Sequence, residues 1–325
     1  MPNLKAPATL VDSPSEIYAE SDIVAKVKEP LENEIPLIRP AQIIFTFFHF
    51  AASRELTQAM IESESTCIAY ETIEDEAGRL PLLTPMSEVA GRMAVFEGSK
   101  HLESPSGGRG VLISGIPGVE SAKVVILGGG VVGLNAAKIA AGLGAQVTIF
   151  DISLDRLRYL SDVLPPNVIT IYSNPYSIRK KVVQADLVIG AVLVHGAKTP
   201  ILVRREDVKR MKDGSVIVDV AVDQGGCVET CKPTTHSNPT YRVEGVLHYC
   251  VANMPGAVAR TSTFALTNAT FPYLKAIAKD GLRAFLALGE AAAKGLNIHR
   301  GRIYHQGVAN AFQLRHYAVT DLTLK

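Results

Sequence analysis

The sequence predicts an α/β fold with two domains: a Rossmann-type doubly wound parallel sheet and a second, discontinuous α/β domain. Three observations predict this fold. Apolar strand-like runs alternate with helix-like segments through the first half of the chain, and six more such runs recur through the second half. Between the halves lies a glycine-rich stretch, "SPSGGRGVLISGIPGV", whose composition is typical of a crossing between domains.

The first half begins with a helix-capping signal. In "SPSE", residues 13–16, a serine precedes a proline and a glutamate at the first and third helical positions, which predicts a short helix. "SRELTQAMIESE" from Ser53 predicts a second helix, and "PMSEVAGRMAVFEGSKHLE" from Pro85 predicts a longer one. Strands are expected at 23–28, 42–49 and 66–71.

The second half has a more regular rhythm. Strand-like runs separated by helical or turn-rich segments are typical of a doubly wound parallel sheet. A long helical segment, 262–293, follows them, with a break expected near Asp280 and Gly281. The expected strands are 123–127, 146–150, 168–172, 186–191, 215–220 and 246–250.

The composition excludes several classes of protein. Charged residues make up 20% of the chain and the formal net charge is +1, so there is no general electrostatic case for binding nucleic acid. The four cysteines are too few and too irregularly spaced for a disulfide framework or a paired-CxxC zinc site, and we expect no metal. Neither a secretory signal nor a membrane span is visible, which favours a cytoplasmic protein.

The segment "KVVILGGGVVGLNAAKIAAGLGAQVTIFD" carries the most specific local signal. Gly128, Gly130 and Gly133 form a G-x-G-x-x-G motif directly after an apolar strand and directly before an alanine-rich helix. Glycines there permit a tight turn, close approach of the backbone to a pyrophosphate, and packing of helix on strand. Asp151 ends the next strand, where a carboxylate accepts both ribose hydroxyls and repels a 2′-phosphate, so NAD is favoured over NADP. The alternative is a chance glycine cluster in a buried turn.

Ligands of open α/β sheets bind at the carboxyl ends of the strands, so the residues that follow each strand are candidates. Asp223 lies beyond its strand and is a better candidate than Asp219, within it, to face a nicotinamide or a substrate. Ser173 and Asn253 also follow strands, and the Asn253 amide could contact the carboxamide end of the cofactor. Arg156 could touch the adenosine phosphate or ribose. For each of them, loop hydrogen bonding or a solvated charge stays open as the alternative.

Hydride transfer needs a proton acceptor and a positive group beside the developing charge. In "QIIFTFFHFAA", His49 keeps phase with Phe45 and Phe47, on a strand face that is otherwise apolar. Lys28 ends the preceding predicted strand in "SDIVAKVKEP". The alternatives are a satisfied core histidine and a solvated edge lysine, and Lys26 is interpreted as a solvated edge residue.

Several further segments are specific, among them "DIVAKVKEPL", "FTFFHFAA", "IAYET", "LPLLTPMSEVAGRMAV", "GSVIVDVAVDQGGCVET", "PTTHSNPTY" and "HYCVANMPGAV". With these and the glycine motif, the chain resembles the L-alanine dehydrogenase family from about Ala8 to about Phe312. The resemblance implies reversible, NAD-linked oxidative deamination of L-alanine to pyruvate and ammonia. Family members are usually hexamers, so the resemblance also implies a homohexamer.

Carried over residue by residue, the resemblance assigns functions to individual side chains. Lys28 looks like the lysine that hydrogen-bonds pyruvate, His49 like the general acid/base for water addition to the iminium, and Asp223 like the carboxylate that supports the amine and carbinolamine steps. Residues 1–84 and 258–325 would form the substrate domain and residues 85–257 the NAD-binding domain. The expected cofactor contacts are Ser87, Gly128, Gly130, Val131, Val132, Gly133, Asp151, Arg156, Ser173, Val192, Leu193 and Asn253.

The chain departs from the family pattern in one large respect. Family members open with a strand, a helix and a further strand ahead of the "ATLV" at Ala8, and an "R-x-G-x-[TS]-P" segment there binds the substrate carboxylate. This sequence has no such segment, and its first arginine, Arg39, does not stand in that pattern. We therefore expect the substrate domain to be truncated at its N-terminus.

Three hypotheses follow. The first is a working alanine dehydrogenase, and the second is a truncated remnant that binds NAD with little or no turnover. The third is a subunit of a proton-translocating transhydrogenase, which shares the general architecture but is usually accompanied by apolar spans. Oxidation of NADH only when pyruvate and ammonium are both present would favour the first, and cofactor binding without turnover the second.

Overall fold

The structure is a computed structural model that describes residues 9–192, 199–222 and 225–322. The chain divides into two compact units. Unit 1 comprises Met1–Leu83 and Thr267–Lys325, and unit 2 comprises Thr84–Leu266. Each unit is built on a mainly parallel sheet with helices, which confirms the predicted α/β fold of two parts. Which unit binds the substrate and which binds the cofactor stays a prediction.

Unit 1 contains a five-stranded sheet with the order β1-β2-β3-β11-β12. The first three strands are parallel, β11 is antiparallel to β3, and β12 is antiparallel to β11. Because Ile43 pairs with both Ile23 and Thr66, the three parallel strands lie in register and end at the same edge. The strands are β1 (Ile23–Ala25), β2 (Ile43–Thr46), β3 (Thr66–Ala69), β11 (Leu296–His299) and β12 (Arg302–Ile303).

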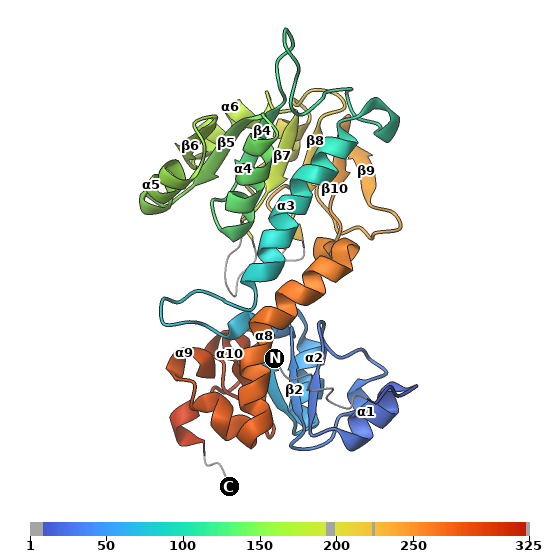
Figure 1. Ribbon diagram of the computed structural model, residues 1–325, viewed down its shortest axis with the longest axis vertical. Coiled ribbons are helices and arrows are strands. Elements are labelled where there is room, and N and C mark those ends of the chain that lie inside the picture. Colours follow the sequence, from blue (N-terminus) through green and yellow to red (C-terminus); the bar gives the residue numbers. More distant parts are fainter. Residues whose placement is uncertain (1–8, 193–198, 223–224, 323–325) are drawn as a thin grey trace, which may run out of the picture. The chain divides into compact units, whose positions relative to one another are not determined.

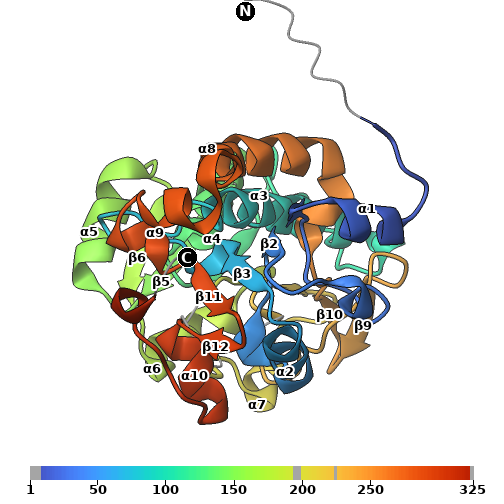
Figure 2. The same cartoon turned by 90° about the horizontal axis from the view of Figure 1, so that it is seen from below.

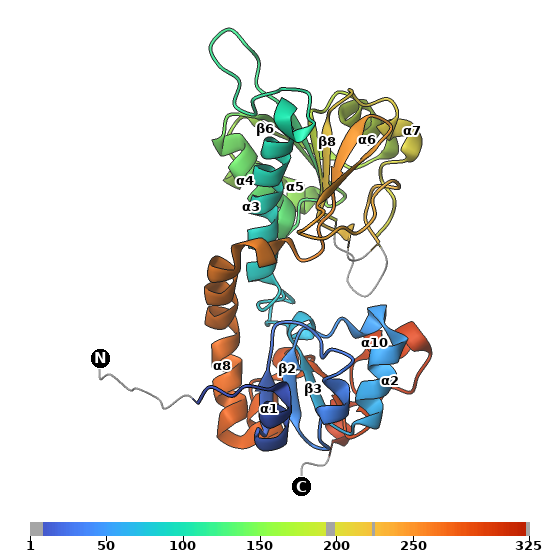
Figure 3. The same cartoon turned by 90° about the vertical axis from the view of Figure 1, so that its right-hand side faces the viewer.

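Helices cover both faces of the unit 1 sheet (Figures 2 and 3), with α2 and α10 on one face and the later part of α8 on the other. The core under α2 and α10 includes Phe48, Met60, Ile298 and Val308, all buried. Short 3-10 turns connect the elements: η1 (Ile35–Leu37), η2 (Phe50–Ala52), η3 (Tyr70–Thr72) and η7 (Val319–Asp321). The helices are α1 (Pro14–Glu20), α2 (Arg54–Glu62), α8 (Ala259–Leu286, which belongs to unit 1 from Thr267 onward), α9 (Glu290–Ala293) and α10 (Gln306–Phe312).

Two helical predictions for unit 1 are confirmed. Ser13 caps α1, because its hydroxyl accepts the backbone N–H of Glu16. The helical geometry of α8 is interrupted at Asp280 and at Gly281, whose φ is +56°, a conformation that glycine adopts without strain. The long C-terminal helical segment is thus two helices joined at the predicted break.

Unit 2 contains a seven-stranded sheet with the order β6-β5-β4-β7-β8-β10-β9 (Figure 1). All strands are parallel except β9, which pairs antiparallel with β10. From β4 the chain adds β5 and β6 on one side, and it then returns to add β7 on the other side of β4. The strand order therefore reverses between β4 and β7, which is a topological switch point. The strands are β4 (Lys123–Leu127), β5 (Gln146–Asp151), β6 (Val168–Tyr172), β7 (Leu187–Gly190), β8 (Val216–Asp219), β9 (Thr240–Val243) and β10 (Val246–Tyr249).

Two apolar cores fix the layers of unit 2. Met93, Ala137 and Leu160 of α3, α4 and α5 belong to one core, and Ile178 and Val208 of α6 and α7 belong to the other. The two helix groups therefore cover opposite faces of the sheet (Figures 1 and 3). The helices are α3 (Thr84–His101), α4 (Val131–Gly142), α5 (Leu154–Val163), α6 (Pro175–Val182) and α7 (Arg205–Val208), with 3-10 turns η4 (Ser104–Ser106) and η6 (Met254–Val258).

The structure corrects several predicted strand lengths. The strands expected at 23–28, 42–49 and 66–71 end at Ala25, Thr46 and Ala69. Apolar side chains continue past these ends, which is why the sequence pattern extends the strands too far. β9 was not predicted: its four residues, Thr240–Val243, carry only a short alternation of polar and apolar side chains, all at least partly exposed. None of the helices in the described ranges is both long and apolar enough to span a bilayer.

Candidate active site

The glycine motif lies where the sequence predicts it, between β4 and α4 in unit 2. Gly128 has a φ of +101°, and an added Cβ there would lie 2.5 Å from the carbonyl oxygen of Ala191. An added Cβ on Gly133 would lie 1.9 Å from the carbonyl oxygen of Gly128. At Gly130, in contrast, an added Cβ would meet nothing within 4 Å. The protein's own packing therefore explains two of the glycines and leaves open space over the third, which fits a backbone cradle for a bound phosphate.

Two charged side chains hold this glycine loop. Asp151, at the end of β5, accepts the backbone N–H groups of Gly129 and Ser153, each at 2.8 Å. Arg156 donates from Nε to the Gly129 carbonyl oxygen at 2.5 Å and from Nη2 to the Gly130 carbonyl oxygen at 3.3 Å. Arg156 thus anchors the loop in this structure.

The other predicted cofactor contacts of unit 2 are spread over several elements. Ser173 follows β6 and donates its backbone N–H to the Asp151 carbonyl oxygen at 2.9 Å. Asn253 has a left-handed φ of 59° at the start of η6, and its carbonyl oxygen lies 3.2 Å from Nε2 of His236. The remaining described contacts are half-buried: Ser87 in α3, Val131 and Val132 in the first turn of α4, and Val192 after β7. Leu193 lies outside the described residues.

Asp219, the last residue of β8, accepts hydrogen bonds from residues on both sides of the segment that follows the strand. Its buried carboxylate accepts the backbone N–H of Ala221 at 3.0 Å and that of Cys227 at 2.9 Å. Burial raises the pKa of Asp219, while the hydrogen bonds from Cys227 and Ala221 lower it. These contacts give Asp219 the structural function that its place within the strand favours. Asp223, the predicted catalytic carboxylate of this loop, lies outside the described residues.

The predicted lysines of unit 1 differ in their surroundings. Lys28 is exposed and lies three residues beyond the end of β1, where its carbonyl oxygen accepts the Thr46 hydroxyl at 2.8 Å. Lys26 is not a solvated edge residue. Its ammonium group forms an ion pair with Glu34, and only 20% of its side chain is exposed to solvent. The interpretation of Lys26 was wrong because the partner comes from a turn that the strand pattern does not indicate.

His49 does not lie on a strand face, and it is not a buried core histidine. It is exposed, has a left-handed backbone with a φ of 53°, and precedes the turn η2. Its ring stacks on Phe47, with the ring planes 3° apart and the centroids 5.8 Å apart. β2 ends at Thr46, so His49 lies beyond the strand. Its even spacing from Phe45 in the sequence therefore does not put it on the same strand face. A non-glycine residue in this conformation is held there by its surroundings.

Glu71 holds His49 in this conformation. It is not among the site residues that the sequence predicts. Its carboxylate accepts the backbone N–H of His49 at 2.6 Å and that of Phe48 at 3.2 Å. Burial raises the pKa of Glu71, while the charge of His49 and the hydrogen bonds from the backbone lower it. The signal that could have found Glu71 is its place in "IAYET", just beyond the third parallel strand.

Lys28, His49 and Glu71 follow three adjacent parallel strands, β1, β2 and β3. Because these strands end at one edge of the sheet, the three side chains come from neighbouring positions along that edge. An exposed imidazole whose backbone is held by a carboxylate is suited to accept and return a proton, and an exposed ammonium to stabilise a developing negative charge. Within the described ranges, no group of three histidine, cysteine or acidic side chains could hold a metal ion.

The comparisons with known proteins give a consistent result. The family model "Alanine dehydrogenase/PNT, C-terminal domain" matches residues 94–306, and "Alanine dehydrogenase/PNT, N-terminal domain" matches residues 3–90. Proteins named alanine dehydrogenase from Halomonas elongata and Methanococcus maripaludis are 50% and 51% identical, over 98% and 95% of this chain and 85% and 83% of their own lengths. A solved structure titled "L-ALANINE DEHYDROGENASE" is 53% identical, with a TM-score of 0.89 over 95% of this chain and 85% of that chain.

A second solved structure shows the fold alone. The transhydrogenase from Sinorhizobium meliloti is 22% identical, with a TM-score of 0.76 over 89% of this chain and 83% of that one. The N-terminal family model matches residues 3–90 of this chain, and the chain spans 85% and 83% of the lengths of the two relatives named above. The hypothesis of an NAD-binding remnant is not favoured, since identity of about one half extends over nearly the whole chain.

Proposed function

The chain belongs to the alanine dehydrogenase/PNT family, and on that premise we propose that it catalyses the reversible, NAD-dependent oxidative deamination of L-alanine to pyruvate and ammonia. The observation that carries this proposal is the 50% identity to the Halomonas elongata alanine dehydrogenase over 98% of the chain. The arrangement of Lys28, His49 and Glu71 along one sheet edge supports it, because these groups supply the acid–base chemistry that the reaction needs.

The proposed cofactor is NAD, which when bound accepts a hydride from the α-carbon of alanine. The open space at Gly130 is suited to its pyrophosphate, since only a residue without a side chain leaves backbone N–H groups accessible there. Asp151 is the proposed ribose contact, and its negative charge disfavours the extra phosphate of NADP. Its hydrogen bond to Gly129 supports this assignment, because the same carboxylate then orders the loop and binds the sugar.

The proposed chemistry of the remaining steps falls to residues of this chain. Loss of hydride leaves an iminium, and water must add to its carbon. His49 accepts a proton from the attacking water, and the resulting carbinolamine collapses to pyruvate as ammonia leaves with a proton. Lys28 stabilises the oxygen that becomes the ketone. Asp223 is proposed to support the amine and carbinolamine steps, on the resemblance alone.

The proposal is tested by following NADH absorbance in the reductive direction. We expect NADH to be oxidised when pyruvate and ammonium are both present and to persist when either is left out. Replacing NADH by NADPH should lower the rate by at least tenfold, because Asp151 repels the added phosphate. Oxidation of NADH with pyruvate alone would contradict the proposal, since it would indicate a 2-oxoacid reductase.

We further propose that the protein acts in the cytoplasm as a homohexamer. The loop before β4 supports self-association, because Leu112, Ile116 and Val119 are exposed by 60%, 59% and 63% of their surface. The substrates are small molecules, and no nucleic acid is proposed as a partner. Light scattering coupled to size exclusion measures the mass directly, and a monomer at working concentration would refute the hexamer.

A further inference from the structure

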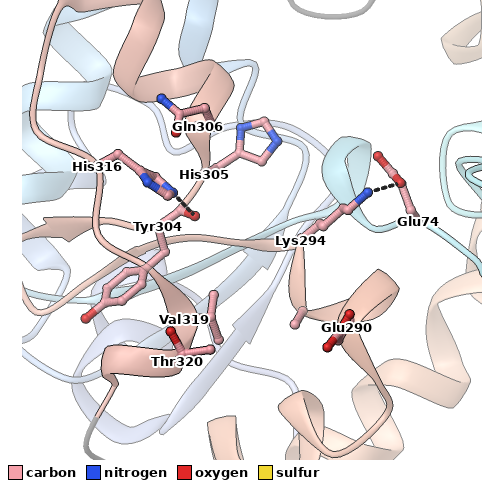
Figure 4. A pocket seen from close by; sticks show the side chains of 10 residues that line it. Glu74, Glu290, Lys294, Tyr304, His305, Gln306, His316, Val319 and Thr320 are labelled. Atoms are coloured by element: carbon pink, nitrogen blue, oxygen red, sulfur yellow. Dashed lines mark hydrogen bonds and ion pairs between the residues drawn. The ribbon is translucent and has the colours of Figure 1, made fainter.

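A pocket of about 560 Å³ lies in unit 1, apart from Lys28 and His49 but at the same edge of the sheet (Figure 4). β11 runs antiparallel to β3, so Lys294, two residues before β11, lies at the edge where β3 ends. β12 runs antiparallel to β11, so His305, two residues after β12, lies at that edge as well. Glu74, which follows η3, completes one wall. The volume falls within the range of small-molecule sites.

Charges of both signs line this pocket. Lys294 and Glu74 form an ion pair at 2.5 Å on one side (Figure 4). Glu290, at the start of α9, is exposed and has no ion pair within the part of the chain that the structure describes. A pure anion in the pocket would meet Glu290, and a pure cation would complement Glu290 alone and leave Lys294 to its ion pair with Glu74. A molecule with one charge of each sign complements both.

Two imidazoles form the opposite side of the pocket (Figure 4). Nδ1 of His305 is buried without a hydrogen-bond partner, and Nε2 of His316 lies 3.1 Å from the Tyr304 carbonyl oxygen. Burial lowers the pKa of His305, and the charges of His316 and Lys294 lower it further, while Glu74 raises it. The lowered pKa favours the uncharged form of the His305 ring, which supplies a polar contact without adding to the charge of the pocket.

Beside the polar Gln306 and Thr320, the rest of the lining is mainly apolar. Ala293 is buried, Tyr304 is 8% exposed, and Val319 is half-buried, and all three line the same pocket. An apolar group placed against them would be removed from water, which favours a ligand with an aliphatic part.

From this arrangement we propose that the pocket is an effector site for a small zwitterionic α-amino acid with an aliphatic side chain. The ligand's carboxylate pairs with Lys294 and its ammonium group with Glu290. Its side chain packs against Ala293 and Val319. This site uses none of the residues assigned to catalysis or to cofactor binding.

A short segment, residues 71–74, connects this pocket to His49. Glu71 holds the backbone of His49, and Glu74, three residues later, holds Lys294. Between them, the Thr72 hydroxyl accepts the Asn297 amide of β11 at 2.6 Å. A ligand carboxylate that competes for Lys294 releases Glu74 and loosens the segment that positions His49. The consequence for turnover, a lower kcat, rests on the proposed function.

Calorimetry on the full chain without NADH or pyruvate tests the site itself. We expect L-leucine to bind saturably, and isocaproate and isopentylamine, which each lack one of its two charges, to bind at least about tenfold more weakly. Equal binding of isocaproate would overturn the proposal in favour of an anion site. The absence of saturable leucine binding would overturn it outright.

Matched lysine variants locate the leucine. Lys294→Met should weaken leucine binding about tenfold, whereas Lys279→Met, another exposed lysine of unit 1, should leave it unchanged. Lys28→Met should also leave it unchanged. Loss of binding in Lys28→Met with retention in Lys294→Met would place leucine in the candidate active site and overturn the proposal. Lys294 has a side chain that is 54% exposed, so its replacement should not disturb folding.

Steady-state kinetics test the coupling to His49. Saturating leucine should lower kcat for the reductive amination of pyruvate at least twofold in the wild type and have no effect in Lys294→Met. An unchanged kcat in leucine-saturated wild type would overturn the coupling. If the protein shows no alanine dehydrogenase activity at all, the proposed function fails, while the calorimetry still decides whether the pocket binds the amino acid.

Discussion

The backbone N–H of His49 donates a 2.6 Å hydrogen bond to the carboxylate of Glu71, which lies in the turn η3 just after the neighbouring parallel strand β3. This bond supports the left-handed backbone of His49 and presents its ring to solvent. The rate of proton transfer depends on the geometry between donor and acceptor. A side chain that transfers a proton must therefore be held in a fixed position. The pair therefore gives a physical basis for assigning His49 to catalysis.

His49→Ala should lower kcat by about 10²- to 10⁴-fold, since the general base for water addition is removed. NAD affinity should stay unchanged because His49 belongs to unit 1 and the glycine loop to unit 2. Steady-state rates and fluorescence titration with NADH measure the two quantities. Full activity of this variant would refute the proposed mechanism.

Glu71→Ala should lower kcat by about tenfold or more, because the backbone of His49 loses its acceptor. Glu71→Gln keeps an amide oxygen that can accept one of the two N–H groups, so it should retain more activity than Glu71→Ala. The KM for pyruvate should change little in either. Equal activity of both variants and the wild type would show that Glu71 does not position His49.

A pair of glycine variants separates cofactor binding from packing. Gly130→Ala should leave the free energy of unfolding nearly unchanged but weaken NAD binding at least tenfold, because its added methyl group occupies space that only a ligand would use. Gly133→Ala should instead destabilise the protein by about 1 to 3 kcal/mol, since its methyl group meets the Gly128 carbonyl oxygen. Unaltered NAD affinity in a folded Gly130→Ala variant would contradict the cradle.

Asp151→Ala should weaken NAD binding about tenfold or more, through loss of the ribose contact and of the hydrogen bond to Gly129. Asp155→Ala is a matched control on the adjoining helix, because the Asp155 side chain is 92% exposed and pairs with Arg158. Titration of both variants with NADH gives the comparison. Equal weakening in the two would indicate a general effect of charge.

Particular residues show which parts of the fold and of the site could be predicted from the sequence. The order of strand, glycine loop, helix and acid around Gly128 and Asp151 could be predicted because each step is local and has a specific steric requirement. The position of His49 could not, because apolar residues continue beyond the end of β2 and conceal where the strand stops. Glu71 escaped notice because its partner is 22 residues away, and only the parallel pairing of β2 and β3 brings them together.

His248 should make the protein less stable in acid. It is fully buried, stacks on Tyr241, and lies 2.7 Å from the Thr230 hydroxyl, and burial lowers its pKa from 6.5 to about 4. Between these two pH values the unfolded chain binds a proton at His248 that the folded protein does not. Stability is therefore retained above pH 6.5 and decreases as the pH falls towards 4, by up to about 3 kcal/mol.

Urea unfolding of the wild type and of His248→Phe at several pH values checks this prediction. The difference between their free energies of unfolding should change across the same interval, since only the wild type carries the titrating imidazole. A constant difference from neutral pH to acid would show that His248 does not titrate in this way.

Isotopic labelling tests the central claim most directly. The protein is incubated with pyruvate, NADH and isotopically labelled ammonium, and the amino acid formed is identified by NMR together with its chirality. The proposed function predicts L-alanine that carries the labelled nitrogen, in an amount equal to the NADH consumed. Formation of lactate, or consumption of NADH without labelled L-alanine, would contradict it.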